Sequence, residues 1–379
     1  MITYSTFTGS AGMPEFFFAG EAARGENFAK EIASLLQEYT AIMAETNCSE
    51  ESEESEVLLR FHISDPANQY PVLRKALAGR KGGFVSVIGQ PPASGARAAL
   101  EAWHWQGVTE QHKHRTRNAV NIQLKGDGAA ILHSLDEIPH GTSASHTGAE
   151  FESLAAYLMQ YGGRVAKNTV RTWLYCRDVD NQYAGLVKAR NIFFDRIGLR
   201  RDTRYIASTG IEGKMTDPHR FVKMDSLSII GLNERHQRPV TAHDMLPPTH
   251  VYGVAFERGM QVFWYDREWC FISGTASIDK DGNVMHPGDV VKQTERMLEN
   301  ITTLLANANM NWQDVKTGTV YLRDAADAEA VTAVLRQKLP EGLPRIIVSA
   351  PVCRPGWLVE MECFSVRSQP HSDGLKLEV

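Results

Sequence analysis

The sequence has few of the features that mark secreted, membrane-spanning or nucleic-acid-binding proteins. Only 5 of its 379 residues are cysteine, and none forms a CxxC pair, so we expect reduced, mostly buried thiols rather than a disulfide framework or a zinc knuckle. No apolar run approaches the ~20 residues of a membrane span, and the N-terminal residues lack a secretory signal. A net charge of −5 gives no electrostatic footprint for nucleic acid. We therefore expect a cytoplasmic protein that binds neither nucleic acid nor membrane.

The common cofactor and nucleophile motifs are also missing. The sequence contains no GxGxxG, P-loop, HExxH or GxSxG pattern, which leaves hydride transfer, phosphoryl transfer and serine hydrolysis unsupported. The histidines at 112 and 114 lie without a carboxylate at ligand spacing. We expect no bound metal and no organic cofactor.

What the chain does contain is one order of elements repeated three times, each copy spanning about a hundred residues. In the last copy a strand at 269–278 precedes a helix with one apolar stripe at 289–308, and further strands and a second helix follow. The predicted fold class is α+β. The predicted divisions are a degenerate N-terminal unit at 1–106, a middle unit at 118–232, a C-terminal unit at 250–368 and a polar tail at 369–379, with linkers rich in charge, His and Pro between the units.

Each unit is predicted to form a mixed sheet with two helices on one face. Such a sheet must also cover its other face, and three units in one chain can do so by packing around a pseudo-threefold axis, as a symmetric trimer would. The chain would then be a monomer, or a homo-oligomer of pseudo-trimers. On the closing strand Glu360 and Glu362 share one face, so we expect both acids at or near a seam between units.

The third unit carries the motifs SGTASID after its first strand and VYLRD in its middle, then Arg345 and Glu360 fifteen residues apart. This set resembles the Rid (YjgF, reactive-intermediate deaminase) family, whose fold is endoribonuclease L-PSP-like and chorismate-mutase-like. The resemblance implies clefts between units, where the arginine holds a substrate carboxylate and the glutamate handles a proton. In the middle unit Arg204 and Lys223 stand at these two positions, so only the cleft that uses the third unit is expected to be catalytically complete.

A wider set of segments covers residues 165–366, and it comprises TWLYCRDVDN, ARNIFFDR, IASTGIEG, YGVAFERG, ISGTASI and HPGDVVKQTERMLENI. Together they resemble the chorismatase family, which cleaves chorismate into pyruvate and a cyclohexadiene or hydroxybenzoate. The resemblance implies that the substrate is bound by Arg190, Arg196, Tyr252, Gly274, Thr275 and Cys353, together with Arg345. In this family, Gly at 274 with Cys at 353 accompanies 3-hydroxybenzoate formation. The sequence departs from the family at 233–250, where His243 and Asp244 replace Tyr and Arg.

The chemistry of chorismate explains why these residue types are needed. Its two carboxylates require two cationic anchors, and Arg grips a carboxylate bidentately. We expect Arg345 to hold one carboxylate and Arg190 or Arg196 the other. Cleavage of the enol ether begins with protonation of its methylene carbon, which needs a carboxylic acid that keeps its proton near neutral pH. Glu360 is the expected donor, because burial and the neighbouring Glu362 both favour the protonated form.

Three functions fit the sequence. The first is a chorismatase-like lyase or hydrolase with its site between the middle and third units. The second is a Rid-type enamine or imine deaminase, which needs only Arg345 and Glu360. The third is a non-catalytic protein that binds a small carboxylate. Alternatively, the Arg and Glu on neighbouring strands form a structural ion pair, and Arg190 and Arg196 are surface residues of their helix.

Overall fold

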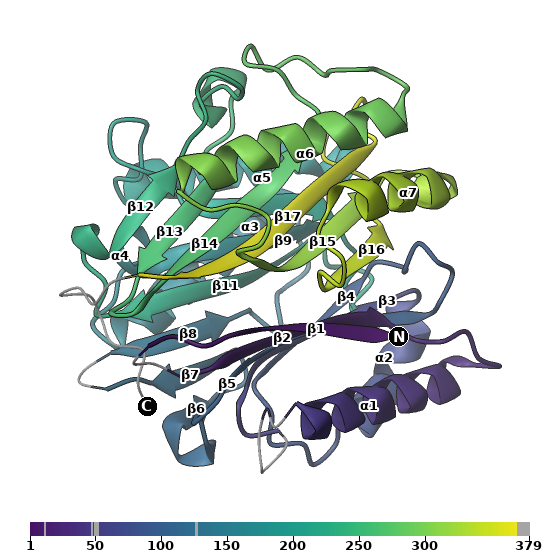
Figure 1. The fold of residues 1–379 in the computed structure, drawn as a ribbon. Helices are drawn as coiled ribbons and strands as arrows, with labels where there is room; N and C mark the ends of the chain where they lie inside the picture. The colour runs from purple at the N-terminus through teal and green to yellow at the C-terminus, as the bar shows by residue number, and fades with distance from the viewer. Residues whose placement is uncertain (11–12, 47, 49–52, 126–127, 370–379) are drawn as a thin grey trace.

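The described residues of the computed structural model, 1–10, 13–46, 48, 53–125 and 128–369, form three mixed β-sheets with helices on their outer faces (Figure 1). The first sheet has the order β1-β2-β5-β3-β4 and comprises β1 (Ile2–Phe7), β2 (Glu15–Glu21), β3 (Glu56–Ile63), β4 (Phe84–Gly89) and β5 (Ala98–Trp105), with helices α1 (Phe28–Glu45) and α2 (Pro66–Ala76). The predicted tail lies outside the described residues beyond position 369.

The other two sheets repeat this layout with one more edge strand each. The second sheet has the order β10-β9-β11-β8-β7-β6 and comprises β6 (Lys113–Arg115), β7 (Ala119–Gln123), β8 (Ala129–His133), β9 (Thr169–Cys176), β10 (Ala207–Glu212) and β11 (Val222–Ile230), with α3 (Ser143–Met159), α4 (Val165–Asn168) and α5 (Val179–Arg196). The third has the order β12-β13-β14-β17-β15-β16 and comprises β12 (Gln237–Val240), β13 (Gly259–Phe263), β14 (Arg267–Ala276), β15 (Val315–Leu322), β16 (Arg345–Ser349) and β17 (Val359–Ser368), with α6 (Val290–Asn307) and α7 (Ala328–Lys338). Short 3-10 helices are η1 (Glu110–His112), η2 (Glu234–His236), η3 (Thr249–Tyr252) and η4 (Ala325–Asp327).

The three sheets share one topology, which confirms the predicted α+β fold of three tandem units. In each unit the closing strand lies inside the sheet and pairs antiparallel with its neighbours. At one edge of each sheet two neighbouring strands run parallel. These pairs are β3 with β4, β9 with β10, and β15 with β16. A parallel pair needs a crossover, and α2, α5 and α7 supply it.

Local signals explain where three long helices begin and why the strands inside the two predicted linkers were missed. Helices α1, α3 and α6 start at polar caps, with Asn27, Thr142 and Asp289 each accepting a hydrogen bond from a backbone N–H of the first turn. The edge strands β6 and β12 lie inside the segments predicted as linkers and pair with β7 and β13. Both are short and carry charged residues or Pro, as exposed edges often do, so they show no apolar alternation.

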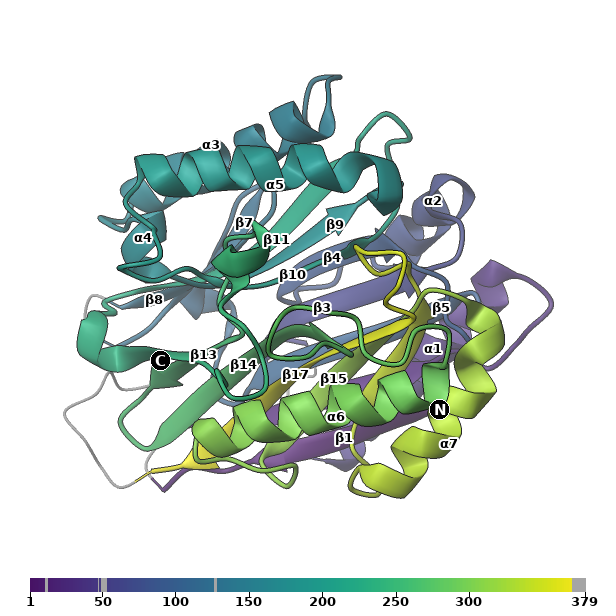
Figure 2. The ribbon, with the colours of Figure 1, turned by 90° about the horizontal axis from the view of Figure 1, so that it is seen from above.

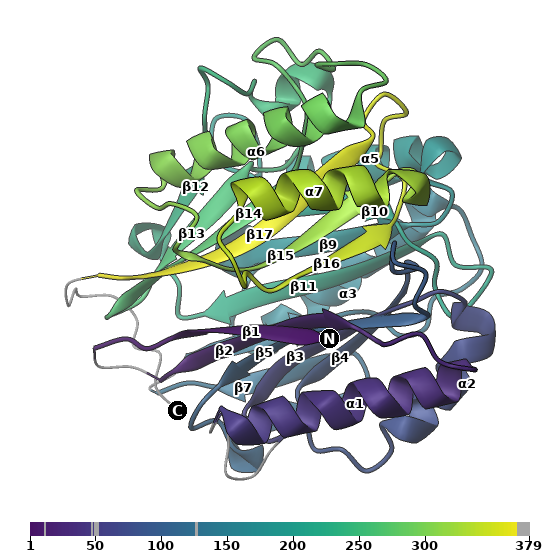
Figure 3. The same cartoon turned by 45° about the vertical axis from the view of Figure 1, so that its right-hand side comes forward.

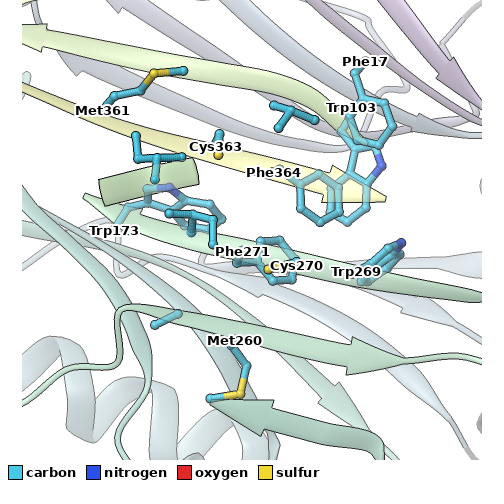
Figure 4. Packing of buried hydrophobic residues seen from close by; sticks show 14 of the residues in the cluster. Phe17, Trp103, Trp173, Met260, Trp269, Cys270, Phe271, Met361, Cys363 and Phe364 are labelled. Carbon is cyan, nitrogen blue, oxygen red and sulfur yellow. The ribbon is translucent and has the colours of Figure 1, made fainter. Parts of the chain in front are cut away.

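The helices lie on the outside, and the inner faces of the sheets share one core (Figure 2). Aromatic side chains make much of the contact between the first and third units (Figure 4). The rings of Phe17 and Phe364 lie 5.4 Å apart, and those of Trp103 and Trp269 lie 4.9 Å apart. Buried aromatics of this size contribute strongly to such a core.

In Figure 3 the sheet of the third unit lies above that of the first, with α6 and α7 on one outer side and α1 on the other. Each unit also bonds to the next through its outer strand, and the three seams repeat the same contact. The chain leaving β4, β10 or β16 forms a backbone bridge with a neighbouring unit; the bridges are Gly89 with Lys214, Ile211 with Val352, and Pro92 with Val348. We call the three contacts the first–second, second–third and third–first seams. Their repetition is the arrangement expected of a pseudo-trimer.

No helix in the described part of the chain is long and apolar enough to cross a bilayer. The same residues contain no group of three or more His, Cys, Asp or Glu side chains placed to hold a metal ion. The described cysteines are free, and, as predicted, most of them are buried, with Cys353 half-buried.

Candidate active site

A narrow pocket lies at the second–third seam and contains Glu360. Its walls come from α5 and β10 of the middle unit, and from β14, β17 and the loops beside them in the third unit. Of the predicted site residues, it brings together Glu360, Arg190, Gly274 and Cys353. Its volume is about 30 Å³, room for a water or two, so a ring-sized ligand enters only after a lining side chain moves.

Glu360 is a buried acid whose surroundings keep it protonated. Its relative exposure is 5%, and its pKa is raised to about 8, first by burial and then by the charge of Glu362, against the opposing effect of Arg258 and Arg171. Desolvation and a like charge both favour the neutral carboxyl. At neutral pH Glu360 is therefore a carboxylic acid that can donate a proton.

Gly274 makes room for that carboxyl. Its backbone N–H donates to the Thr209 hydroxyl of the middle unit at 2.9 Å. A Cβ added at position 274 would lie 2.1 Å from Oε1 of Glu360. Any larger residue at Gly274 would thus displace the acid.

Glu362 lies on the same face of β17, but it is hydrogen-bonded to the middle unit and does not face the pocket. It accepts a hydrogen bond from Arg171 Nη2 at 2.7 Å and one from Trp173 Nε1 at 2.8 Å, both from β9 of the middle unit. The predicted seam position of the two acids is thereby confirmed. Glu362 ties two units together and adds to the raised pKa of Glu360, whereas Glu360 faces the pocket.

Arg190 brings a buried positive charge to the pocket. Its relative exposure is 1%, and neither Nε nor Nη2 has a hydrogen-bond partner among the described residues. Burying unpaired guanidinium donors is costly. A bound anion would supply the missing acceptors.

Two further arginines line the pocket, and the sequence analysis did not select either. Arg258 donates to the Pro247 carbonyl at 3.2 Å and lies over the ring of Phe256. Arg354 lies over the ring of Trp357, 5.4 Å from its centroid. The signal for Arg258 was present in the segment YGVAFERG, whose Phe and Arg both line the pocket.

Tyr183 was also missed. It lies on α5 seven residues before Arg190, a spacing that puts both side chains on one helical face. It lines the pocket beside Cys353. The pKa of the Cys353 thiol is raised to about 12, mainly by burial and then by Glu360, so the thiol stays neutral and lines the wall.

Arg345 does not share this pocket, so the expected pairing with Glu360 is wrong. Arg345 lines a separate cleft at the third–first seam and donates to the Leu343 carbonyl at 3.1 Å. The reason is the position of its strand. β16 is the outer strand that contacts the first unit, whereas β17 presents Glu360 to the middle unit.

Strand pairing also shows which residues are equivalent between units. Lys223 occupies the position of Glu360 on its closing strand, as predicted. The register of the outer strands, however, puts Ser208 rather than Arg204 at the position of Arg345. Ser208 lines the Glu360 pocket. The middle unit therefore contributes a hydroxyl to this pocket at the strand position where the third unit has the Arg345 guanidinium.

The remaining predicted residues lie outside the pocket lining. The Arg196 side chain is 57% exposed and pairs with Glu152, so it is a surface residue. Thr275 is fully buried and donates to the Ser273 carbonyl at 2.9 Å. Tyr252 belongs to η3, and its side chain lies outside the described part of the structure.

Comparison with known proteins shows similarity to a protein family, to a curated enzyme and to a solved structure. Residues 260–367 match the family model described as endoribonuclease L-PSP. Over 92 residues, 24% of this chain, the sequence is 35% identical to the 3-aminoacrylate deaminase RutC of Acinetobacter baylyi, 73% of which is covered. A crystal structure of a chorismatase superposes with a TM-score of 0.68 at 18% identity, covering 93% of this chain and 98% of that one. At that identity the match shows a shared fold.

Proposed function

This chain belongs to the endoribonuclease L-PSP (Rid) family, and from that premise we propose that it is a chorismatase-like enzyme. Its reaction would cleave the enolpyruvyl ether of chorismate into pyruvate and a hydroxybenzoate, with 3-hydroxybenzoate as the product. The observation that carries the proposal is a carboxylic acid, Glu360, protonated at neutral pH in a pocket that also holds the unpaired donors of Arg190.

The two carboxylates of chorismate need two cations, and the pocket contains them. Arg190 would bind one carboxylate through Nε and Nη2, whose acceptors are missing among the described residues. Arg258, whose charge acts on Glu360, would bind the other. A guanidinium presents paired N–H groups in the geometry that a carboxylate accepts.

Glu360 would then protonate the terminal methylene of the enol ether. The positive charge appears at the ether carbon as an oxocarbenium ion, and the carboxylate left on Glu360 stabilises it. Capture of the cation by a ring hydroxyl, followed by release of pyruvate and loss of a ring proton, gives the aromatic product. The atoms balance without net water, and the ring proton restores the acid.

Gly274 and Cys353 would favour capture of the cation by the ring hydroxyl rather than by water. Both line the wall beside Glu360, and a glycine leaves space that a side chain at 274 would fill. The family resemblance associates this pair with 3-hydroxybenzoate. No chemical step in the scheme requires a metal or an organic cofactor.

The test is incubation of purified protein with chorismate, with pyruvate followed over time and the aromatic product identified by mass. Wild type should release pyruvate and 3-hydroxybenzoate. Glu360→Gln should lower the rate of pyruvate release by about 100-fold or more, the usual contribution of a general acid. Glu295→Gln, which changes a half-exposed helical acid, is the matched control. Absence of pyruvate with wild type would reject the proposal.

One observation favours a second candidate, an enamine or imine deaminase. The family match covers residues 260–367, which belong to the third unit, and 92 residues of the chain are 35% identical to a 3-aminoacrylate deaminase. Such chemistry would use Glu360 for proton transfer to the enamine carbon. Ammonia release from 2-aminoacrylate, with no pyruvate from chorismate, would favour this reading. Binding of small carboxylates without turnover of either substrate would indicate the non-catalytic alternative.

A further inference from the structure

The first–second seam contains a second cleft, larger than the Glu360 pocket, with a volume of about 660 Å³. It lies between α2 and β4 of the first unit and β11 with its neighbouring loops in the middle unit. The strand registers make it the counterpart of the Glu360 pocket. Lys223 takes the position of Glu360, and Val85 takes that of Ser208.

Basic side chains outnumber acidic ones on the lining of this cleft, although the whole chain has a net charge of −5. Its charged lining residues are Arg74, Lys75, Arg117, Asp136, Arg220 and Lys223. Arg117 pairs with Asp136 at 2.8 Å, and Arg220 pairs with the buried Glu150. Arg74 and Lys75 are exposed and form no ion pair within the described part of the chain, so their charge is available to a ligand.

Lys223 adds a third cation deep in the cleft. Its Nζ donates to the Ser86 hydroxyl at 2.7 Å and lies 3.2 Å from Oδ1 of Asp225. An ammonium has three N–H groups, so one remains for a ligand acceptor. The buried Ser134 hydroxyl, also on the lining, has no hydrogen-bond partner among the described residues.

The floor between these cations is apolar. Tyr70, Phe84 and Val85 line it, and Val85 is 44% exposed, a high value for an apolar strand residue. Pockets for small molecules combine such an apolar surface with a few convergent polar groups, at volumes of about 300–1,000 Å³. This cleft has both properties.

We propose that the first–second cleft binds a small organic anion, a carboxylate on an aromatic or cyclic body. The ring would lie against Phe84 and Val85, and the carboxylate would meet Arg74, Lys75 and the free N–H of Lys223. The cleft binds without turnover, because the position of the acid Glu360 holds a lysine. This inference does not depend on the reaction proposed for the other seam.

The test is a ¹⁹F NMR titration with 4-fluorobenzoate, which gives a dissociation constant from the ligand signal. Two variants address the cleft. Arg74→Glu with Lys75→Glu reverses the two exposed charges, and Val85→Trp fills the apolar floor without changing charge. The control, Lys280→Glu with Lys292→Glu, makes the same charge change at lysines whose side chains are 67% and 60% exposed.

Wild type and the control should bind 4-fluorobenzoate with the same affinity, and added salt should weaken binding as it screens the cations. Both cleft variants should lose at least tenfold in affinity. Binding that is unchanged in both cleft variants, or no saturable binding to wild type, would overturn the proposal. Circular dichroism melting of each variant establishes that it is folded.

Discussion

At the scale of single residues, the central finding is that two glutamates on one strand face have different surroundings. Glu362 is held by Arg171 and Trp173 across the seam, so its charge is compensated. In the described part of the chain no hydrogen bond joins Glu360 to a cation, and burial followed by the charge of Glu362 raises its pKa to about 8. The uncompensated acid is therefore the one that faces the pocket and can donate a proton.

This difference predicts the pH dependence of turnover. The protonated form of Glu360 is the active one and exists below its pKa, so the raised pKa keeps the enzyme active through neutral pH. Turnover at saturating chorismate should fall tenfold per unit above about pH 8. Because Glu360 and Glu362 interact, the fitted value belongs to the pair. Initial rates from pH 5.5 to 9.5 measure it, and a rate that rises with pH across this range would contradict the assignment.

Gly274 gives a second prediction at this scale. Gly274→Ala would place a Cβ 2.1 Å from the Glu360 carboxyl, so the acid must move from its position over the substrate. A displacement of this size should lower pyruvate release by about 100-fold. Gly148→Ala on α3, where a Cβ meets nothing within 4 Å, is the matched control. Equal activities in the two variants would show that the position of the carboxyl is not critical.

At the scale of elements, strand position decides which charged residues meet. Arg345 and Glu360 lie fifteen residues apart on neighbouring parts of one sheet, yet β16 contacts the first unit and β17 the second. The spacing that carries the family resemblance therefore places the two residues in different seams of the same chain. Of the arginines expected from the sequence, Arg190, on the crossover helix of the middle unit, is the one that lines the Glu360 pocket.

Matched substitutions test whether Arg190, rather than Arg345, binds the substrate beside Glu360. Arg190→Met should lower kcat/KM for chorismate by about 10- to 150-fold, the value of a hydrogen bond to a charged group. Arg345→Met and Arg196→Met should leave it within about twofold, because both lie outside the pocket lining. If only Arg345→Met lost activity, Arg345 would be the substrate-binding arginine, as expected from the sequence, and Arg190 would not bind the substrate.

Periodicity predicted the long elements and their threefold repetition, because an apolar stripe on a helix or strand is written in local sequence. It did not reveal β6 and β12, whose charged and Pro-containing edges show no alternation. The family resemblance, not periodicity, selected Glu360, Gly274, Cys353 and Arg190 as expected site residues, and the structure places all four on the lining of one pocket. The seam at which Arg345 lies depends on how the units pack against one another, and residue spacing in the sequence does not predict this packing.

At the scale of the whole molecule, equivalent acids join the three units. Glu101, Asp225 and Glu362 occupy the same position on their closing strands. Each accepts a hydrogen bond across a seam, from Thr319, Arg60 and Arg171 respectively. The three seams thus share a buried acid that accepts a hydrogen bond from the neighbouring unit. The residue two positions before this acid differs, Glu360 in one unit and Lys223 in another, so the clefts differ in their chemistry.

Breaking one such contact should destabilise the whole chain. Arg171→Met would leave Glu362 buried with an uncompensated charge, which typically costs about 3–5 kcal/mol. Arg200→Met removes only an exposed pair with Asp195, worth at most about 1 kcal/mol. Urea unfolding of both variants measures the difference. Similar free energies of unfolding would mean that the seam contact contributes little to stability.

Glu360 is expected to keep its proton at neutral pH, and infrared spectroscopy tests this without any assumption about the substrate. The difference spectrum between wild type and Glu360→Gln should contain the C=O stretch of a protonated carboxyl at pH 7. That band should disappear as the pH is raised through about 8. A difference spectrum at pH 7 with only carboxylate bands would contradict the account, because an ionised Glu360 has no proton to donate.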